Sequence, residues 1–124
     1  MLESDISLAA TADTSYHQDF EVYQGEERNI RFRLMDGDVP VLVDQMNDIH
    51  WRVRRSFANP DVVISKGLMD GSVNIIPGTN IFYIPLRPVD TDGLEGYYWH
   101  DLRIFAGKIF VATVGRIDVK KSTF

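Results

Sequence analysis

The stretch Gly93–Phe105 reads GLEGYYWHDLRIF, and it decides the fold of this chain. From Tyr98 onward, one set of residues (Tyr98, His100, Leu102, Ile104) alternates with another (Trp99, Asp101, Arg103, Phe105). A period of two is typical of a β-strand with one face in the core. Turn-forming residues stand before the stretch, and Ala106-Gly107 follows it. The pattern therefore predicts a long central strand, entered through a tight corner and left through a hairpin.

The same alternation occurs in two earlier stretches, 29–34 and 48–55, where apolar residues alternate with polar ones. Each stretch predicts a half-buried strand. A tryptophan at an inward position is well suited to fill the space between two packed sheets. The three stretches together predict a structural core of Ile30, Phe32, Leu34, Trp51, Val53, Tyr98, His100, Leu102 and Ile104.

Short alternating or apolar runs, separated by turn residues every eight to twelve positions or so, continue along the rest of the chain. No helix longer than about one turn is expected. This spacing predicts an all-β fold, an immunoglobulin-like antiparallel β-sandwich of about eight strands. The corner Thr91-x-x-Leu94-x-x-Tyr97 resembles the tyrosine corner of such sandwiches. A β-barrel is the alternative, because hairpin connections occur in both architectures.

Charged residues are unevenly distributed along the chain. The first 27 residues hold seven of the 18 acidic residues and no Lys or Arg, so the remainder carries 11 acids against 13 bases. We expect residues 1–18 to form an acidic, extended N-terminal arm and residues 19–124 to form the sandwich domain. Two hypotheses for the arm stay open: a solvated tail, or a segment that becomes ordered on a neighbouring subunit.

Composition and spacing argue against several kinds of chemistry. The chain has no cysteine, and His17, His50 and His100 lack the short spacing of metal ligands. The two Asp-Gly turns lack the remaining oxygen ligands of a calcium loop. Neither a nucleophile motif nor a phosphate loop is present. We expect no enzyme activity, no cofactor and no bound metal. We also expect no membrane span and no export signal.

Arginines provide the first candidate contact surface. Arg31, Arg33, Arg52 and Arg54 have outward parity on two strands that we expect to be adjacent or nearly so, and Arg103 and Arg116 extend the set. Interleaved acids favour a solvated, salt-bridged face, and a protein interface is the next hypothesis, since the guanidinium group pairs bidentately with carboxylates. Nucleic acid is disfavoured by a pI near 5.0.

Aromatic residues provide the second candidate contact surface. Tyr97 and Trp99 share the outward parity of Asp101 and Arg103. Aromatic rings on a sheet surface suit either a partner or a sugar ring. His100 has inward parity, where a hydrogen-bonded core histidine is expected.

Several motifs resemble those of small proteins from tailed bacteriophages and prophages. The quoted segments are Gly25-Glu26-Glu27-Arg28-Asn29-Ile30-Arg31-Phe32, Asp36-Gly37-Asp38-Val39-Pro40, Trp51-Arg52-Val53-Arg54, Gly96-Tyr97-Tyr98-Trp99-His100-Asp101-Leu102-Arg103-Ile104 and Gly115-Arg116-Ile117-Asp118-Val119. The layout is similar to the N-terminal immunoglobulin-like domain of phage baseplate upper proteins. The match covers roughly residues 19–119.

The resemblance implies a virion structural protein, assembled in the host cytoplasm. Such a protein would join components of the tail tip or baseplate, the neck or the capsid. Its partners would be other phage structural proteins and copies of itself, and the resemblance transfers no catalytic residue. The residues that we expect to contact a partner are Arg31, Arg33, Arg52, Arg54, Tyr97, Trp99 and Arg103. The alternative function is a carbohydrate- or cell-surface-binding β-sandwich module that uses Tyr97 and Trp99.

Overall fold

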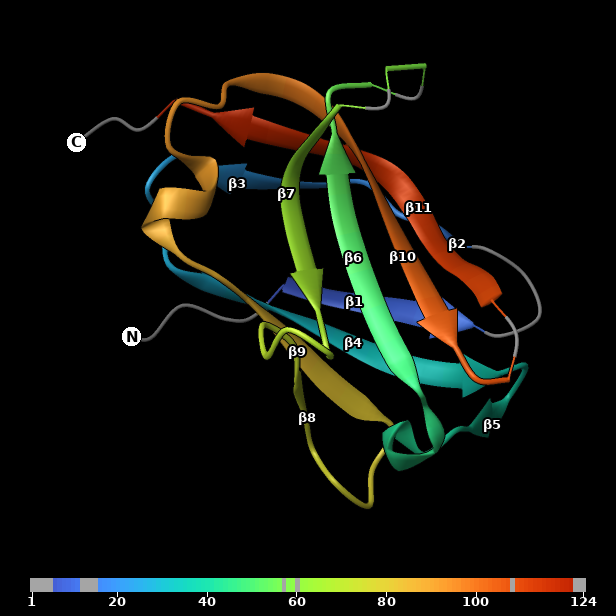
Figure 1. Ribbon diagram of the computed structural model, residues 1–124. Coiled ribbons are helices and arrows are strands. Elements are labelled where there is room, and N and C mark those ends of the chain that lie inside the picture. Colours follow the sequence, from blue (N-terminus) through green and yellow to red (C-terminus); the bar gives the residue numbers. More distant parts are fainter. Residues whose placement is uncertain (1–5, 12–15, 57, 60, 108, 122–124) are drawn as a thin grey trace.

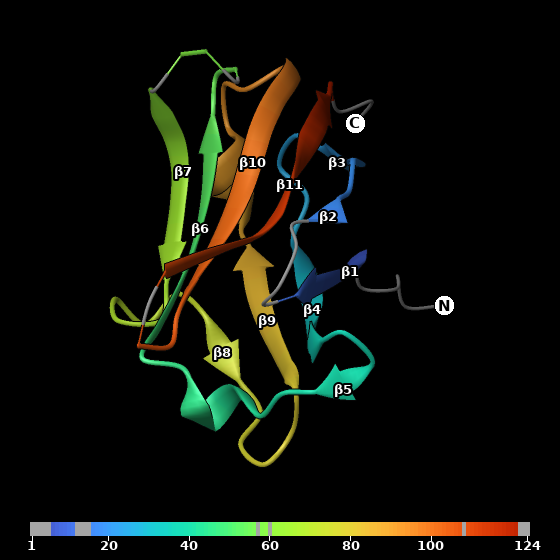
Figure 2. The same ribbon diagram turned by 90° about the vertical axis from the view of Figure 1, so that its right-hand side faces the viewer.

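The computed structural model describes residues 6–11, 16–56, 58–59, 61–107 and 109–121. They form two β-sheets packed face to face as a sandwich (Figures 1 and 2), and the strands do not close into a barrel. Short 3-10 turns at Val43–Gln45 and Pro88–Thr91 are the helical elements of the described residues. Within those residues, no helix is long and apolar enough to span a bilayer. The prediction of an all-β sandwich is therefore confirmed.

Each sheet collects strands from distant parts of the sequence. The first sheet has the order β1-β4-β9-β8, and β5 pairs with β4. Its strands are β1 (Ile6–Thr11), β4 (Arg28–Asp36), β5 (Val39–Pro40), β8 (Asn74–Ile75) and β9 (Ile81–Leu86). The second sheet has the order β2-β11-β10-β6-β7, and β3 pairs with β11. Its strands are β2 (Tyr16–His17), β3 (Phe20–Tyr23), β6 (Asp48–Arg54), β7 (Val62–Gly67), β10 (Gly96–Phe105) and β11 (Ile109–Lys120).

The core lies between the sheets and contains the side chains that the alternation placed there. All nine predicted core residues are buried, and Trp51 and Phe32 are among the largest fully buried side chains. Phe32 of β4 stacks on Phe82 of β9, with ring centroids 5.1 Å apart. Removing these apolar surfaces from water is the main favourable term for folding.

Both sheets are mixed, which corrects the expected purely antiparallel pairing. β1 pairs in parallel with β4, from Ile6 opposite Ile30 to Thr11 opposite Met35. β2 and β3 pair in parallel with β11. The reason is that the N-terminal segment supplies edge strands to both sheets in turn. Each of these strands runs in the same direction as the strand it pairs with, whereas two strands joined by a hairpin run in opposite directions.

Part of the expected N-terminal arm thus lies on the sheets of its own chain. Residues 6–11 and 16–17 are edge strands of the sandwich, and Gln18 follows them. The Gln18 side chain bonds both backbone groups of Ala9, accepting from Ala9 N at 3.0 Å and donating to Ala9 O at 2.6 Å. Thr113 of β11 also donates to Ala9 O, at 2.8 Å. These bonds connect β1 in the first sheet to the edge of the second.

Between β2 and β3, the N-terminal segment runs parallel to β11, and its backbone at Gln18 nearly touches Gly115. A Cβ added to Gly115 would lie 2.0 Å from the carbonyl oxygen of Gln18. A side chain at position 115 is therefore incompatible with this close approach. A glycine inside a strand often marks a close backbone approach, and Gly115 has this role here.

The corner before β10 differs from the expectation. The resemblance to a tyrosine corner rested on Tyr97, but the side chain of Tyr97 lies largely in solvent. Tyr98 is the buried residue, and its hydroxyl accepts from Glu95 N at 3.2 Å and donates to Glu95 O at 3.4 Å. The side chain of Tyr98 points inward along β10. The hydroxyl of Tyr98, and not that of Tyr97, therefore bonds the backbone of the corner.

Candidate functional site

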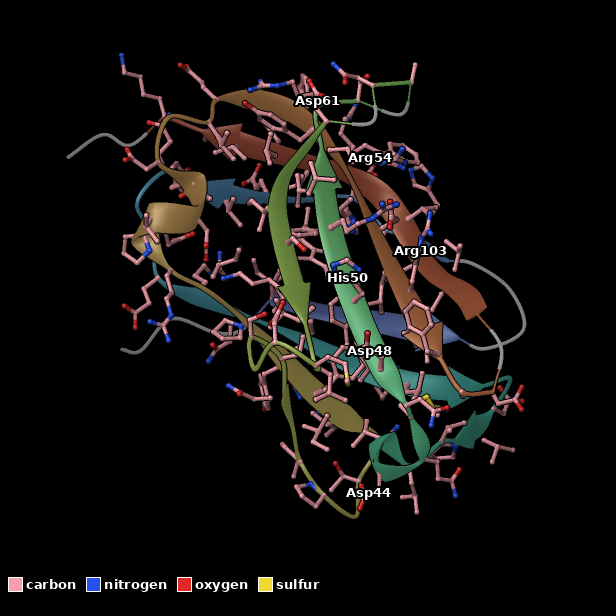
Figure 3. All side chains as sticks on the ribbon, in the orientation of Figure 1. Asp44, Asp48, His50, Arg54, Asp61 and Arg103 are labelled. Atoms are coloured by element: carbon pink, nitrogen blue, oxygen red, sulfur yellow. The ribbon has the colours of Figure 1, made fainter. Side chains whose placement is uncertain are left out.

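The candidate site lies on the outer face of the second sheet, where β10 and β6 are neighbours. Asp101 is opposite Arg52, Trp99 is opposite Arg54, and Arg103 is opposite His50. Because Trp51 and Val53 point into the core, the even-numbered residues of β6 point outward. Figure 3 looks onto this face, with Arg54 and Arg103 labelled beside the two strands.

Asp101 is at the centre of a cluster of three arginines, which we call the Asp101 cluster: Arg52, Arg54, Arg103 and Asp101. Arg52 donates hydrogen bonds from Nε and Nη2 to the two carboxylate oxygens of Asp101, each at 3.3 Å. Arg54 Nε lies 3.4 Å from Oδ2, and Arg103 Nε lies 3.7 Å from Oδ1. The arginines cover the carboxylate so fully that only 5% of the Asp101 side chain is exposed.

Charge and hydrogen bonding are unbalanced within the Asp101 cluster. Three guanidinium groups face one carboxylate, and within the described residues no second carboxylate lies within 4.0 Å of any of them. The Nε atoms of Arg54 and Arg103 are buried against Asp101, and within the described residues neither forms a hydrogen bond. An additional anion could therefore be bound only through the terminal nitrogens of these two arginines, whose side chains are 19% and 41% exposed.

Aromatic side chains border the Asp101 cluster on the β11 side. Trp99 is half-buried, and its ring makes an edge contact with His17 at 5.7 Å between centroids. Tyr97 is 63% exposed, and the guanidinium carbon of Arg116 lies 4.5 Å from its ring centroid. That distance is within the range of a cation–π contact.

A shallow hollow lies next to Tyr97, between β3 and β11. Its lining is Asp19, Phe20, Glu21, Tyr97, Arg116 and Asp118. The Arg116 amide donates to Asp19 Oδ1 at 2.7 Å, and this bond, with the nearby His17, lowers the pKa of the Asp19 carboxyl. The hollow thus combines an exposed ring with an ionised carboxylate.

Arg31 and Arg33 belong to a different surface, which corrects the expected single arginine patch. Both are on β4, whose neighbours are β1 and β9, whereas Arg52 and Arg54 are on β6 in the other sheet. The two pairs of arginines therefore lie on opposite outer faces of the sandwich. Alternation shows that a side chain points outward, but it does not show from which sheet.

His100, the residue before Asp101, belongs to the interior and is fully hydrogen-bonded. Its Nε2 donates to the carbonyl of Gln18 at 2.7 Å, because a carbonyl can only accept. Its Nδ1 accepts from the indole nitrogen of Trp51 at 3.3 Å. Burial lowers the pKa of His100 below its ordinary value, so the ring is neutral near pH 7. Both ring nitrogens are in use, and no group of the ring faces solvent.

Asp101 is the site residue that the sequence reasoning missed. Its outward parity grouped it with the interleaved acids of a solvated face, and the prediction named only the arginines. Two signals were available: Asp101 lies between Trp99 and Arg103 on one strand, and two arginines share a parity on another. Neither signal reveals that the two strands are neighbours. In the part of the chain that the structure describes, no group of His, Asp or Glu is arranged to hold a metal ion.

Comparisons with known proteins support the fold. No protein-family profile matches the sequence, and no curated protein matches it either. Among solved structures, the chain is similar to the N-terminal domain of phage TP901-1 ORF48, with a TM-score of 0.62 and 6% sequence identity. The alignment covers 94% of this chain and 98% of that domain. At this identity the likeness shows that the two share a fold.

Proposed function

We propose that this protein is a non-enzymatic structural component of a bacteriophage virion. In this role it docks or decorates components of the tail tip or baseplate, the neck or the capsid through protein–protein contacts. The observation that carries the proposal is the likeness of nearly the whole chain to a domain of a phage protein. The phage-type motifs of the sequence support it independently of that likeness.

The distribution of polar groups agrees with a docking role. Interior polar groups such as His100 are matched with partners, which favours a rigid scaffold. The outer face of the second sheet presents arginine and exposed aromatic residues together, a composition that is enriched at protein interfaces. A rigid sandwich with one such face is suited to holding other proteins in place.

Mass spectrometry of purified phage particles tests the proposal. The protein should be present at a fixed ratio to the other structural proteins, and particles made without its gene should lack one discrete component. A protein that is absent from washed particles and that incorporates into none when supplied in excess would contradict the proposal.

A carbohydrate- or cell-surface-binding role is the second candidate, favoured by the exposed ring of Tyr97 beside the hollow at β3 and β11. Aromatic faces next to carboxylates can hold a sugar ring by stacking and hydrogen bonds. Glycan-array binding that disappears in both Tyr97→Ala and Trp99→Ala would support this role. The structural proposal expects no glycan signal from either the wild type or the variants.

A further inference from the structure

We infer that the Asp101 cluster is a preorganised receptor for a carboxylate-bearing segment of a partner protein. The inference rests on the proposed function, since it assigns the chemistry of one docking contact. Its basis is the geometry of Arg54 and Arg103 around Asp101.

Asp101 organises the three arginines around it. A carboxylate opposite Arg52, covered by three guanidinium groups, holds those groups in place before any partner arrives. Side chains that are already immobilised lose less entropy on binding, which improves affinity. Asp101 thus orients the arginines while neutralising only one of their three charges.

The donors left for a partner are the terminal nitrogens of Arg54 and Arg103. Arg52 uses Nε and Nη2 on Asp101. The Nε atoms of Arg54 and Arg103 are buried and face Asp101, so a partner cannot reach them. Their side chains are 19% and 41% exposed, and each guanidinium group has further N–H donors on its terminal nitrogens. An incoming carboxylate would take up these donors, and charge-assisted bonds of this kind are among the stronger polar contacts in proteins.

The short length of the basic zone favours a protein carboxylate over nucleic acid. From Trp99 to Arg103 the strand extends about 13 Å, at about 3.3 Å per residue. Acidic residues limit this basic zone: Asp48 is opposite Phe105 at one end, and Asp118 is opposite Tyr97 at the other. The chain as a whole carries a net charge of −5. A nucleic acid would continue beyond the zone with a phosphate at every nucleotide, whereas a flexible acidic peptide can place one or two carboxylates within the zone and turn the others toward solvent.

The test uses the full chain, labelled with ¹⁵N, and hexaglutamate peptide as the probe at low ionic strength. The Nε–H signals of Arg54 and Arg103 should shift and saturate, and added salt should weaken the binding. The variant Arg54→Gln/Arg103→Gln should bind hexaglutamate about tenfold more weakly, or worse. Arg31→Gln/Arg33→Gln is the matched control, because it makes the same charge change on the opposite outer face.

Three results would overturn the inference. They are unshifted Arg54 and Arg103 signals at saturating peptide, equal loss of binding in the two double variants, and tighter binding of a thymidine oligonucleotide than of hexaglutamate. Thermal unfolding of each variant confirms that the comparison is between folded proteins.

Particle incorporation separates this inference from the proposed function. If Arg54→Gln/Arg103→Gln enters particles as well as the wild type does, the cluster is not the docking contact although the protein is structural. If the wild type binds hexaglutamate at the cluster but is absent from particles, the receptor stands and the virion role fails.

Discussion

His100 and Asp101 are consecutive residues of β10 whose side chains leave the sheet on opposite faces, and both are buried polar groups. Around His100 every donor has one acceptor: Trp51 donates to Nδ1, and Nε2 donates to Gln18. Around Asp101 one carboxylate serves three cations, and the buried Nε atoms of Arg54 and Arg103 contact it without forming a hydrogen bond. The inner network is complete within the chain, whereas the outer one gains from an additional anion. The difference distinguishes a polar group that serves the fold from one that suits a partner.

The largest expected effect tests the inner face. Trp51→Ala removes a fully buried indole and leaves Nδ1 of His100 without its donor. The free energy of unfolding should fall by about 3–5 kcal/mol, as measured by urea denaturation. Trp99→Ala, on the outer face of the same sheet, should cost clearly less. A loss below about 1 kcal/mol for Trp51→Ala would contradict its place in the inter-sheet core.

Gly115→Ala tests the close approach between Gln18 and Gly115, which places the Gln18 carbonyl beside His100. The new methyl group would overlap the Gln18 carbonyl, so either the approach must widen or the bond to His100 must be lost. We expect a loss of about 2–4 kcal/mol in the same denaturation experiment. Gly67→Ala is the control, because its nearest obstacle is the movable Asp70 side chain at 3.3 Å, and it should cost less than about 1 kcal/mol. Equal effects at the two glycines would show that the backbones of Gln18 and Gly115 are not in tight contact.

Asp101→Asn tests the outer face by removing the one negative charge of the Asp101 cluster. Three mutually repelling guanidinium groups would remain, and we expect a loss of about 1–3 kcal/mol at low salt. The loss should shrink at high ionic strength, because salt screens the repulsion among partly exposed cations. Asp118→Asn on the same face should change stability by less than about 0.5 kcal/mol. A variant that is as stable as the wild type at low salt would show that Asp101 does not hold the arginines.

The smallest expected effect is a pH dependence from His100. Burial lowers its pKa in the folded state, so the unfolded chain takes up the proton first as the pH falls below about 6.5. Stability from the neutral ring is complete above that pH and is lost toward lower pH, by up to about 1.4 kcal/mol per pH unit. Urea denaturation between about pH 7 and pH 5 measures the slope, and His100→Gln should reduce it. An unchanged slope in the variant would mean that His100 is not the titrating group.

Much of the fold could be predicted from local alternation. The stretches around Phe32, Trp51 and Leu102 identified their buried faces because a strand places successive side chains on opposite sides. The edge strand β1 was missed, although Ile6, Leu8 and Ala10 alternate with smaller or polar residues. Its acidic surroundings suggested a solvated arm. The parallel pairings were missed for another reason. The relative direction of two paired strands depends on the path of the chain between them, which local alternation does not show.

The candidate site could be predicted only in part. Arg52, Arg54 and Arg103 were selected from parity, and so were Arg31 and Arg33, which the structure places on the other sheet. Asp101 was left out because an outward carboxylate is usually solvated. Its burial comes from the side chains of a neighbouring strand, about 50 residues away in the sequence.

The sequence by itself determined which residues face the core and which face outward, because the side-chain period of a strand is a local property of the backbone. The tertiary structure alone decided which strands became neighbours, because pairing joins segments that are distant in the chain. Strand pairing placed Arg52 opposite Asp101, brought Arg54 and Arg103 to the same carboxylate, and put Arg31 and Arg33 on the far side of the sandwich.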